Sequence, residues 1–247
     1  MYEEGRAKIR FIGEAFLNPE AMFSRDLSVA LVNGFANRST KILDPTAATG
    51  IRGIRYFLET KSKEVTMLDM NKNAYEAAKK NTKSNKVKAK VLNLSIQEFV
   101  NTTKSKFDVI DFDPFGSVAP NVYDLLKASS GGGYLFLTAT DTAVLCGAQE
   151  RACRKIYDAN PMHNELCHEV GIRILIGYVA RAAMQFNYGI EVILAVSYAH
   201  YMRVFLKLRY GEESSHDSIK ELGYAYHCNK CGFNSTEKGF FPFQLHA

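Results

Sequence analysis

The sequence predicts a doubly wound α/β fold whose mostly parallel sheet ends in an antiparallel hairpin. From residue 41 onward, short apolar runs alternate with helix-like stretches, which is the βαβ rhythm of a parallel sheet. Further along, residues 190–201 and 203–210 form two β-rich runs with almost no connection between them. Only a hairpin joins strands that tightly, so the last two strands are expected to be antiparallel.

The expected elements follow one another in a regular order. Residues 134–137 are apolar on both faces, as in central strands that helices cover on each side. A long helix is expected at 165–186, before the hairpin. The other expected strand and helix pairs are 42–44 with 51–60, 65–69 with 73–81, 91–93 with 96–102, and 107–112 with 121–128, followed by a strand at 133–140.

Length and composition indicate the domain organisation. The chain has 247 residues, 47% hydrophobic and 23% charged, which is the composition of a globular protein with a sizeable core. We expect one main domain at residues 1–211, including a short N-terminal extension. Residues 212–247 are expected to form a polar linker and a short C-terminal segment, either truncated or naturally short.

Composition also excludes several classes of protein. No uncharged apolar run approaches the roughly 18 residues of a membrane span, so no membrane association is expected. The first residues carry acids and lack the apolar core of a secretory signal, which favours a cytoplasmic location. The odd number of cysteines, five, favours reduced thiols. The net charge of +5 fits a nucleic-acid partner but does not require one.

A loop of small residues, 45–50, follows the first strand and opens a helix. Small residues let a ligand approach the backbone, and the helix N-terminus offers free N–H groups. The loop contains a single glycine, Gly50, and lacks the G-x-G-x-x-G pattern of dinucleotide sites. A ligand without phosphates therefore suits it better, and a nicotinamide dehydrogenase is disfavoured. The alternative is an ordinary strand-to-helix turn.

The sheet pattern and this loop together are typical of the Rossmann-like (class I) methyltransferases that use S-adenosylmethionine. Asp69 ends the second strand, about 20 residues past the glycine loop, where an acid commonly binds ribose hydroxyls. With its neighbour Met70 it is a candidate cofactor contact; alternatively it caps the next helix, a role that Asn71 fills equally well. The third strand places Ser95 and Ile96 beside the adenine, where many methyltransferases carry an acid.

The segment Asp113-Pro114-Phe115-Gly116 ends the fourth strand, at the edge where open α/β sheets bind ligands. Methyltransferases that modify amino groups use an Asp or Asn, a proline and an aromatic residue at this location. An exocyclic amine is a poor nucleophile, and a carboxylate that accepts its N–H would orient it and take up developing positive charge. The alternative is a turn punctuated by proline.

These residues are predicted to have separate roles at the reaction centre. Asp113 is the candidate catalytic residue, helped by the Pro114 carbonyl, while Phe115 would stack on the target base. A direct displacement at the sulfonium methyl needs neither a metal nor a covalent intermediate. A stacked base must first be flipped out. The seven lysines in residues 72–90 are a candidate phosphate-facing surface, or alternatively a solvated helix face.

Several longer strings resemble the tRNA (guanine-N2)-dimethyltransferase family, especially its archaeal members, which modify guanosine 26 of tRNA. The similarity runs in order from about residue 16 to residue 226. The strings are Phe16-Leu17-Asn18-Pro19-Glu20 with Ser24-Arg25-Asp26-Leu27, residues 48–55, 111–117, 138–143, 165–175 and 189–192.

This resemblance implies that Arg25 and Arg52 contact the cofactor, since an arginine can pair with the methionine carboxylate through two parallel bonds. It also implies cofactor binding by Asp69 and catalysis by Asp113, with tRNA as the partner and no obligate protein partner. Residues 141–170 would border the pocket for the target base. Within them, single residues such as His163 and His168 are expected to be structural.

The chain departs from the family at its C-terminal end. Family members usually continue into a longer RNA-binding domain. Cys228 and Cys231 resemble the first half of the four-cysteine zinc site of some archaeal members, but the second pair is absent. S-adenosylmethionine is therefore the expected cofactor, and zinc bound by these cysteines with His227 or His246 is the less favoured alternative.

Two rival functions remain open from the sequence. One is another RNA or DNA amino methyltransferase, acting on adenine N6 or on guanine N2 of rRNA. The other is a noncatalytic RNA-binding relic of the fold, although Asp69, Asp113 and both arginines are retained. The sequence does not disclose whether one or two methyl groups are added, whether neighbouring guanosines are modified, or the oligomeric state.

Overall fold

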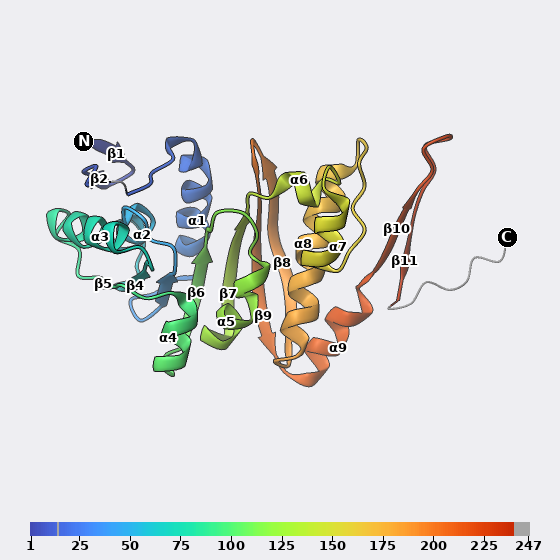
Figure 1. Ribbon diagram of the computed structural model, residues 1–247. Coiled ribbons are helices and arrows are strands. Elements are labelled where there is room, and N and C mark those ends of the chain that lie inside the picture. Colours follow the sequence, from blue (N-terminus) through green and yellow to red (C-terminus); the bar gives the residue numbers. More distant parts are fainter. Residues whose placement is uncertain (14, 240–247) are drawn as a thin grey trace. The chain divides into compact units, whose positions relative to one another are not determined.

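The computed structural model describes residues 1–13 and 15–239, and the chain divides into two compact units (Figure 1). The first unit comprises Met1–Pro114 and Asp124–Thr138, and the second comprises Phe115–Tyr123 and the described residues from Ala139 onward. Both the parallel sheet and the antiparallel hairpin that the sequence predicts are present.

The first unit is built from parallel strands and the helices between them. Its elements are β1 (Tyr2–Glu4), β2 (Ala7–Ile9), the short 3-10 helix η1 (Pro19–Ala21), α1 (Met22–Phe35), β3 (Lys41–Asp44), α2 (Ile51–Glu59), β4 (Glu64–Leu68), α3 (Lys72–Ser84), β5 (Lys90–Leu92), α4 (Ile96–Thr102), β6 (Phe107–Phe112), most of α5 (Val122–Ala128), and β7 (Ser129–Ala139).

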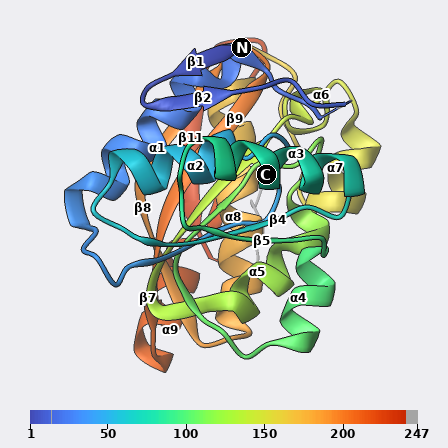
Figure 2. The same cartoon turned by 90° about the vertical axis from the view of Figure 1, so that its left-hand side faces the viewer.

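Its parallel strands lie in the order β5-β4-β3-β6-β7. The order runs one way from β3 to β5 and the other way from β6 to β7, so the chain changes direction between the adjacent strands β3 and β6. The loops that leave these two strands diverge, and the crevice at their carboxyl ends is where open α/β sheets bind ligands. In Figure 2, α2 and α3 lie on one side of β4 and β5, and α4 lies on the other.

The central strands are apolar on both faces, and for that reason both faces are buried. Ile42 and Leu43 of β3 and Ile110 of β6 are fully buried. Helix α2 approaches β4 closely at Gly53, where an added Cβ would lie 2.4 Å from the sulfur of Met67. This close packing fixes the first turn of α2 above the carboxyl ends of the strands.

The N-terminal hairpin was not expected from the sequence. Strands β1 and β2 are antiparallel, and Ile9 packs with Ile51 and Ile54 of α2 in one buried cluster. The side chains of Asn81 on α3 and of Asn85, its C-cap, accept hydrogen bonds from the backbone N–H groups of Arg10 and Lys8. The N-terminal extension is therefore an integral part of the first unit.

The second unit is built around an antiparallel strand pair. β8 and β9 pair in the register Tyr188 with Tyr210 to Tyr198 with Tyr201, with one irregularity after Val192, which confirms the predicted hairpin. The elements are the 3-10 helix η2 (Ala119–Asn121), α6 (Thr142–Leu145), α7 (Glu150–Tyr157), α8 (Cys167–Met184), β8 (Tyr188–Tyr198), β9 (Tyr201–Tyr210), α9 (Glu212–Lys220), β10 (Gly223–His227) and β11 (Asn234–Lys238).

The sequence predicts that residues 212–247 begin with a polar linker, and this part of the prediction is wrong, because Glu212–Lys220 form α9. Gly189 lies so close to this helix that an added Cβ would be 2.1 Å from the Ser214 carbonyl oxygen, and Ser215 is buried. Tertiary packing thus orders a segment whose polar composition resembles a loop. Among the described residues no helix is both long and apolar enough to cross a membrane.

Candidate active site

The loop after β3 lies at the carboxyl end of the parallel sheet and leads into α2. Gly50 has a φ of +83° and begins α2, and an added Cβ would lie 3.1 Å from the Cα of Ala78. Both the backbone conformation and the close neighbour require glycine at this position. Ala48, with a φ of 47°, also adopts the left-handed conformation. The loop therefore has a defined backbone conformation at the carboxyl end of β3.

Asp69 holds this loop in place from the end of β4. Its Oδ2 accepts a hydrogen bond of 2.8 Å from the Ala48 backbone N–H, and its Oδ1 accepts one of 2.9 Å from Asn71 N. Asn71 caps α3, so of the two capping candidates the structure selects Asn71. Met70 is 77% exposed. Asp69 joins the two loops between which a ribose would lie.

Asn93, which directly follows β5, was not predicted from the sequence as a site residue. Its Nδ2 donates to the backbone carbonyls of Asp69 and Met70, at 2.8 and 3.1 Å. It thereby fixes the backbone of the two predicted cofactor residues. Its signal in the sequence was a polar side chain where a parallel strand ends.

Ser95 has a structural role at the start of α4. It is the N-cap of this helix, where its hydroxyl accepts from the Glu98 backbone N–H and donates to the Glu98 carboxylate. Ile96 is buried in the core. The Ser95 hydroxyl is thus engaged in a capping box, so an adenine contact here would come from the backbone. The adenine role of Ser95 and Ile96 stays a prediction.

Arg52 joins two carboxylates at the end of β6. Its Nη1 donates to Asp111 Oδ2 at 3.0 Å, and its Nη2 forms a short ion pair with Asp113. Arg52 is 6% exposed and Asp111 is fully buried. The Tyr56 hydroxyl, one turn further along α2, also donates to Asp111. The sequence did not predict that Arg52 contacts the candidate catalytic residue.

Asp44, the last residue of β3, belongs to the same charged group. It is buried, and its Oδ2 has no hydrogen-bond partner among the described residues. Burial, followed by the neighbouring carboxylates Asp111 and Asp113, raises the pKa of Asp44 to about 7, against the opposing charge of Arg52. Burial would lower the pKa of Arg52, but the carboxylates of Asp111 and Asp113 outweigh it and raise that pKa above its ordinary value.

Asp113 lies where this buried group reaches solvent. Its backbone N–H donates to Thr46 Oγ1 at 3.1 Å, which joins the ends of β6 and of the β3 loop. Its side chain is 24% exposed, whereas that of Asp111 is inaccessible. A carboxylate that is fixed on one side and open on the other can accept a hydrogen bond from a bound amine.

Phe115 and Gly116 of the Asp-Pro-Phe-Gly segment lie in the second unit, whereas Pro114 belongs to the first. Phe115 is 78% exposed. Gly116 has a φ of +77°, and it exchanges two hydrogen bonds with Thr140: its N–H donates to the hydroxyl, and its carbonyl accepts from the backbone. Thr140 was not singled out as a site residue, and it fixes the turn that presents Phe115.

A second polar network follows Thr140 in this unit. The Tyr157 hydroxyl contacts both oxygens of Asp141, at 3.0 and 2.9 Å, and receives a hydrogen bond from Ser117. Burial raises the pKa of Asp141, although Tyr157 lowers it in part. Asp141 opens the block that the family resemblance placed beside the target base.

Arg25 is paired within the protein. Its Nε and Nη2 donate to the two oxygens of Glu4, at 2.7 and 2.5 Å, and Arg55 also binds Glu4 at 2.7 Å. All three side chains are buried. Arg25 thus binds a carboxylate through two parallel bonds, as expected for the cofactor, but that carboxylate belongs to β1. Its contact with a cofactor stays a prediction.

Cys228 and Cys231 lie in the turn between β10 and β11. Backbone N–H groups of Cys231 and Lys230 lower the pKa of Cys228. His227 Nδ1 is engaged by Asn234 at 2.7 Å, and His246 lies outside the described residues. Within residues 1–13 and 15–239, the group of three metal-ligating side chains lies elsewhere, at Cys146, Cys167 and His168.

Comparison with known proteins shows similarity along almost the whole chain. The family model described as N2,N2-dimethylguanosine tRNA methyltransferase matches residues 2–246. The tRNA (guanine(26)-N(2))-dimethyltransferase of Pyrococcus abyssi is 39% identical over 267 residues, which cover 99% of this chain and 70% of that protein. The enzyme of the same name from Methanothermobacter thermautotrophicus is 33% identical, covering 96% of this chain and 63% of that protein.

A solved structure is similar over the same range. Trm1 from Pyrococcus horikoshii, in complex with S-adenosyl-L-methionine, superposes with a TM-score of 0.94 at 37% identity, covering 99% of this chain and 70% of that one. The predicted fold class is therefore confirmed. Trm5b from Pyrococcus abyssi, 14% identical with a TM-score of 0.59, shares the fold alone.

Proposed function

Because the chain belongs to the N2,N2-dimethylguanosine tRNA methyltransferase family, we propose that it methylates the exocyclic N2 of guanosine 26 in tRNA, with S-adenosylmethionine as the methyl donor. The observation that carries the proposal is Asp113, which is held by Arg52 at the carboxyl end of β6, where the direction of the sheet changes.

The residues at this edge fit S-adenosylmethionine. The one-glycine loop offers backbone and the N-terminus of α2 without a dinucleotide fingerprint, and the buried Asp44 Oδ2 lacks a partner among the described residues. An unpaired acidic oxygen suits a ligand that carries an ammonium and a sulfonium. We propose Arg25, Arg52, Asp69, Met70, Ser95 and Ile96 as the cofactor-binding residues.

The cofactor supplies an electrophilic methyl group, and the protein orients the nucleophile. Asp113 would accept an N–H of the guanine amine, with the Pro114 carbonyl as a second acceptor, and would take up developing positive charge. Arg52 fixes the carboxylate so that its free oxygen faces the amine. Arg52 thereby holds the acceptor in place before the base arrives, which limits the reorganisation needed in the transition state.

The target base must leave the stack to reach Asp113. The exposed ring of Phe115 would offer it a stacking surface. On α3 and the residues after it, all seven lysines from Lys72 to Lys90 are exposed, whereas Ala74, Ala77 and Ala78 face the core. A one-sided row of cations of this kind suits a phosphate backbone. RNA binding there and a cytoplasmic location are parts of this proposal.

The C-terminal assignments also stay proposals. We propose residues 1–211 as the methyltransferase domain and residues 212–247 as a short C-terminal segment. Cys228 and Cys231 are kept as the candidate half of a zinc site. The chain covers about two thirds of the length of its relatives.

Mass spectrometry of tRNA after reaction tests substrate and product together. Wild-type protein, labelled S-adenosylmethionine and unmodified tRNA should give N2-methylated guanosine at position 26. A matched tRNA with adenosine at that position should stay unmodified. Methylation that maps to an adenine, or to rRNA alone, would replace this proposal with the rival amino methyltransferase. Absence of cofactor binding by calorimetry would favour the noncatalytic relic.

A further inference from the structure

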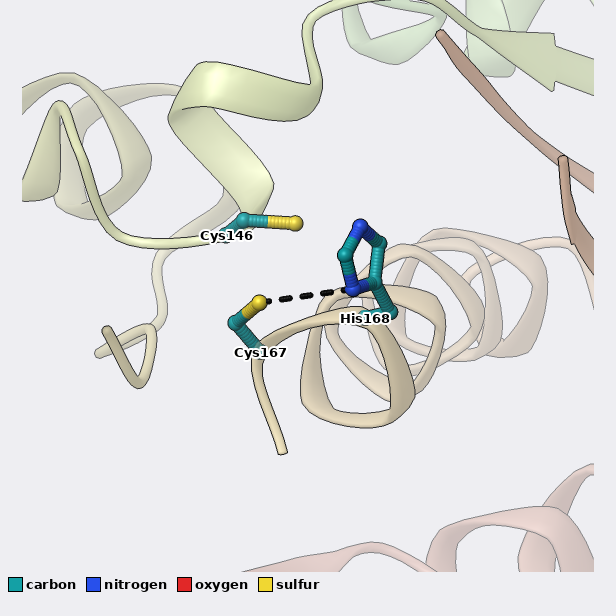
Figure 3. A group of neighbouring side chains, drawn as sticks. All are labelled: Cys146, Cys167 and His168. Carbon is teal, nitrogen blue, oxygen red and sulfur yellow. Dashed lines mark hydrogen bonds between the residues drawn. The ribbon is translucent and has the colours of Figure 1, made fainter. Parts of the chain in front are cut away.

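Three potential metal ligands converge in the second unit, within the block of residues 141–170. Cys146 directly follows α6, Cys167 is the first residue of α8, and His168 is next to it. Figure 3 shows the three side chains pointing toward one another. Their ligand atoms all lie within 4.8 Å of one another, and Cys167 Sγ is 3.5 Å from His168 Nδ1.

We propose that Cys146, Cys167 and His168 bind a zinc ion. Zinc lies about 2.3 Å from a cysteine sulfur and about 2.0 Å from an imidazole nitrogen, so ligand atoms on a tetrahedral zinc are about 3.5 to 3.8 Å apart. The Cys167 sulfur and the His168 nitrogen already have this separation. The other two pairs of ligand atoms lie within 4.8 Å of each other, and small side-chain rotations would bring them to this separation.

The backbone on both sides of the group is held in place. The Cys146 N–H donates to the Thr142 carbonyl at 2.7 Å, and the Cys167 N–H donates to the Asn164 carbonyl at 3.0 Å. At Gly171 on α8, an added Cβ would lie 3.2 Å from the Leu145 carbonyl oxygen. Glycine thus lets α8 approach the end of α6, and this approach brings the two cysteines together.

The ligand types select the metal. Two thiolates and an imidazole are soft and borderline ligands, which suit zinc and disfavour magnesium and calcium. On coordination each thiol gives up its proton to solvent, and the imidazole binds in its neutral form. Three protein ligands leave a fourth position for water. His163, whose Nδ1 lies 3.2 Å from the Cys146 carbonyl oxygen, is adjacent but outside the group.

The zinc would join the end of α6 to the start of α8. No residue of the group carries a role in the proposed methyl transfer, so this inference stands or falls apart from the proposed function. It also differs from the candidate zinc site at Cys228 and Cys231. The experiment must separate the two cysteine sites.

The test uses the full chain carrying Cys228→Ser and Cys231→Ser, which removes the other candidate site. After treatment with a chelator, zinc is added, excess metal is removed, and bound zinc is measured by elemental mass spectrometry. We expect one zinc per chain. Cys146→Ser, Cys167→Ser and His168→Ala should each weaken zinc binding at least tenfold, with folding checked by circular dichroism.

Cys153→Ser is the matched control, since Cys153 is a buried cysteine of α7 outside the group, and it should keep the zinc. Cobalt substitution needs no further variant, because thiolate ligation of the cobalt ion should give an intense sulfur-to-metal charge-transfer band in the near ultraviolet. Zinc that depends only on Cys228 and Cys231, copper binding without zinc binding, or a Cys146–Cys167 disulfide in freshly purified protein would overturn the proposal.

Discussion

Arg52 and Asp113 form an ion pair between the first turn of α2 and the end of β6. The same guanidinium binds the buried Asp111, so one cation fixes two carboxylates of which only Asp113 reaches solvent. The proposed catalytic carboxylate is therefore held by Arg52 of α2, which is also a proposed cofactor-binding residue. Cofactor binding and orientation of the base should be coupled through Arg52.

Replacement of Asp113 should separate binding from chemistry. We expect Asp113→Asn to lower the rate of methyl transfer by about 100- to 10,000-fold, the usual range for a general-base or charge-stabilising carboxylate. Asparagine keeps the shape and the contact with Arg52, so S-adenosylmethionine affinity, measured by calorimetry, should change little. Asp113→Ala is expected to lose as much activity. Turnover close to wild type in either variant contradicts the proposed mechanism.

Arg52→Lys should show that the planar guanidinium, with its two directed N–H donors, matters as well as the positive charge. A lysine ammonium is a point charge that does not reproduce two directed bonds to Asp111 and Asp113. We expect a lower methyl-transfer rate and weaker cofactor binding in a folded protein. Arg52→Ala would leave Asp111 buried without its cation and should destabilise the fold by about 3–5 kcal/mol. Urea denaturation and calorimetry measure the two effects, and an Arg52→Lys enzyme equal to wild type would refute the coupling.

Asp44 should make stability depend on pH. Its pKa rises from an ordinary value of 3.8 to about 7 on folding, so the protonated carboxyl is the form that the folded state prefers. The contribution to stability is full below about pH 4 and is lost as the pH rises through 7. Asp44→Asn has no carboxyl group to ionise, so the variant should not lose this stability as the pH rises. The variant should match wild type near pH 4 and exceed it at pH 8.

The gain at pH 8 is bounded by the size of the pKa shift, at about 4 kcal/mol, because each pKa unit corresponds to about 1.4 kcal/mol. Urea denaturation at pH 4, 6 and 8 without cofactor measures it. A stability difference that does not vary with pH would contradict the assignment. The same variant should bind S-adenosylmethionine more weakly if the unpaired Oδ2 contacts the cofactor.

Much of the sheet could be predicted from the sequence, because the periodicity of apolar residues indicates which positions are buried. The strand at 107–112 and the helix at 96–102 were predicted with their observed bounds, and the hairpin was predicted from two adjacent β-rich runs. The N-terminal hairpin and α9 were missed. The residues of these two elements are polar or form runs too short to show a periodicity. Contacts with α2 and α3 order the hairpin, and contact with β8 orders α9.

The site was predictable where a residue follows a strand. Asp69 and Asp113 were predicted as site residues because the carboxyl ends of parallel strands meet at one edge of the sheet, and their roles stay predictions. The partners of Arg25 and Arg52 were not predictable, since Glu4 is 21 residues away from Arg25 and Asp113 is 61 residues away from Arg52 along the chain. The group of Cys146, Cys167 and His168 depends on the packing of α8 against α6, which leaves no spacing motif.

Arg25 and Arg55 offer a matched pair, because both bind Glu4 but only Arg25 is proposed to contact the cofactor. Removal of either arginine leaves Glu4 with one partner fewer, so both variants should lose stability. Arg25→Gln should in addition weaken S-adenosylmethionine binding about tenfold or more, whereas Arg55→Gln should not. Calorimetry on both variants, at a temperature where each is folded, makes the comparison. Equal cofactor affinity in the two would remove Arg25 from the cofactor site.

Phe115 should act on the RNA and leave the cofactor unaffected. Its ring is exposed and follows Pro114 directly, and one stacked base is worth about 1–3 kcal/mol. We expect Phe115→Ala to lower kcat/KM for tRNA by about 5- to 150-fold, the same energy expressed as a rate ratio. Phe115→Tyr retains a stacking face and should keep most of the activity.

Phe11, an exposed aromatic residue of the N-terminal segment, supplies the control, because Phe11→Ala removes an exposed ring of the same kind much earlier in the sequence. It should leave kcat/KM unchanged. S-adenosylmethionine affinity should be the same in all three variants. A Phe115→Ala enzyme that binds the cofactor poorly, or a Phe115→Tyr enzyme as impaired as the alanine variant, would show that Phe115 serves the fold of the turn rather than the stacking of guanine.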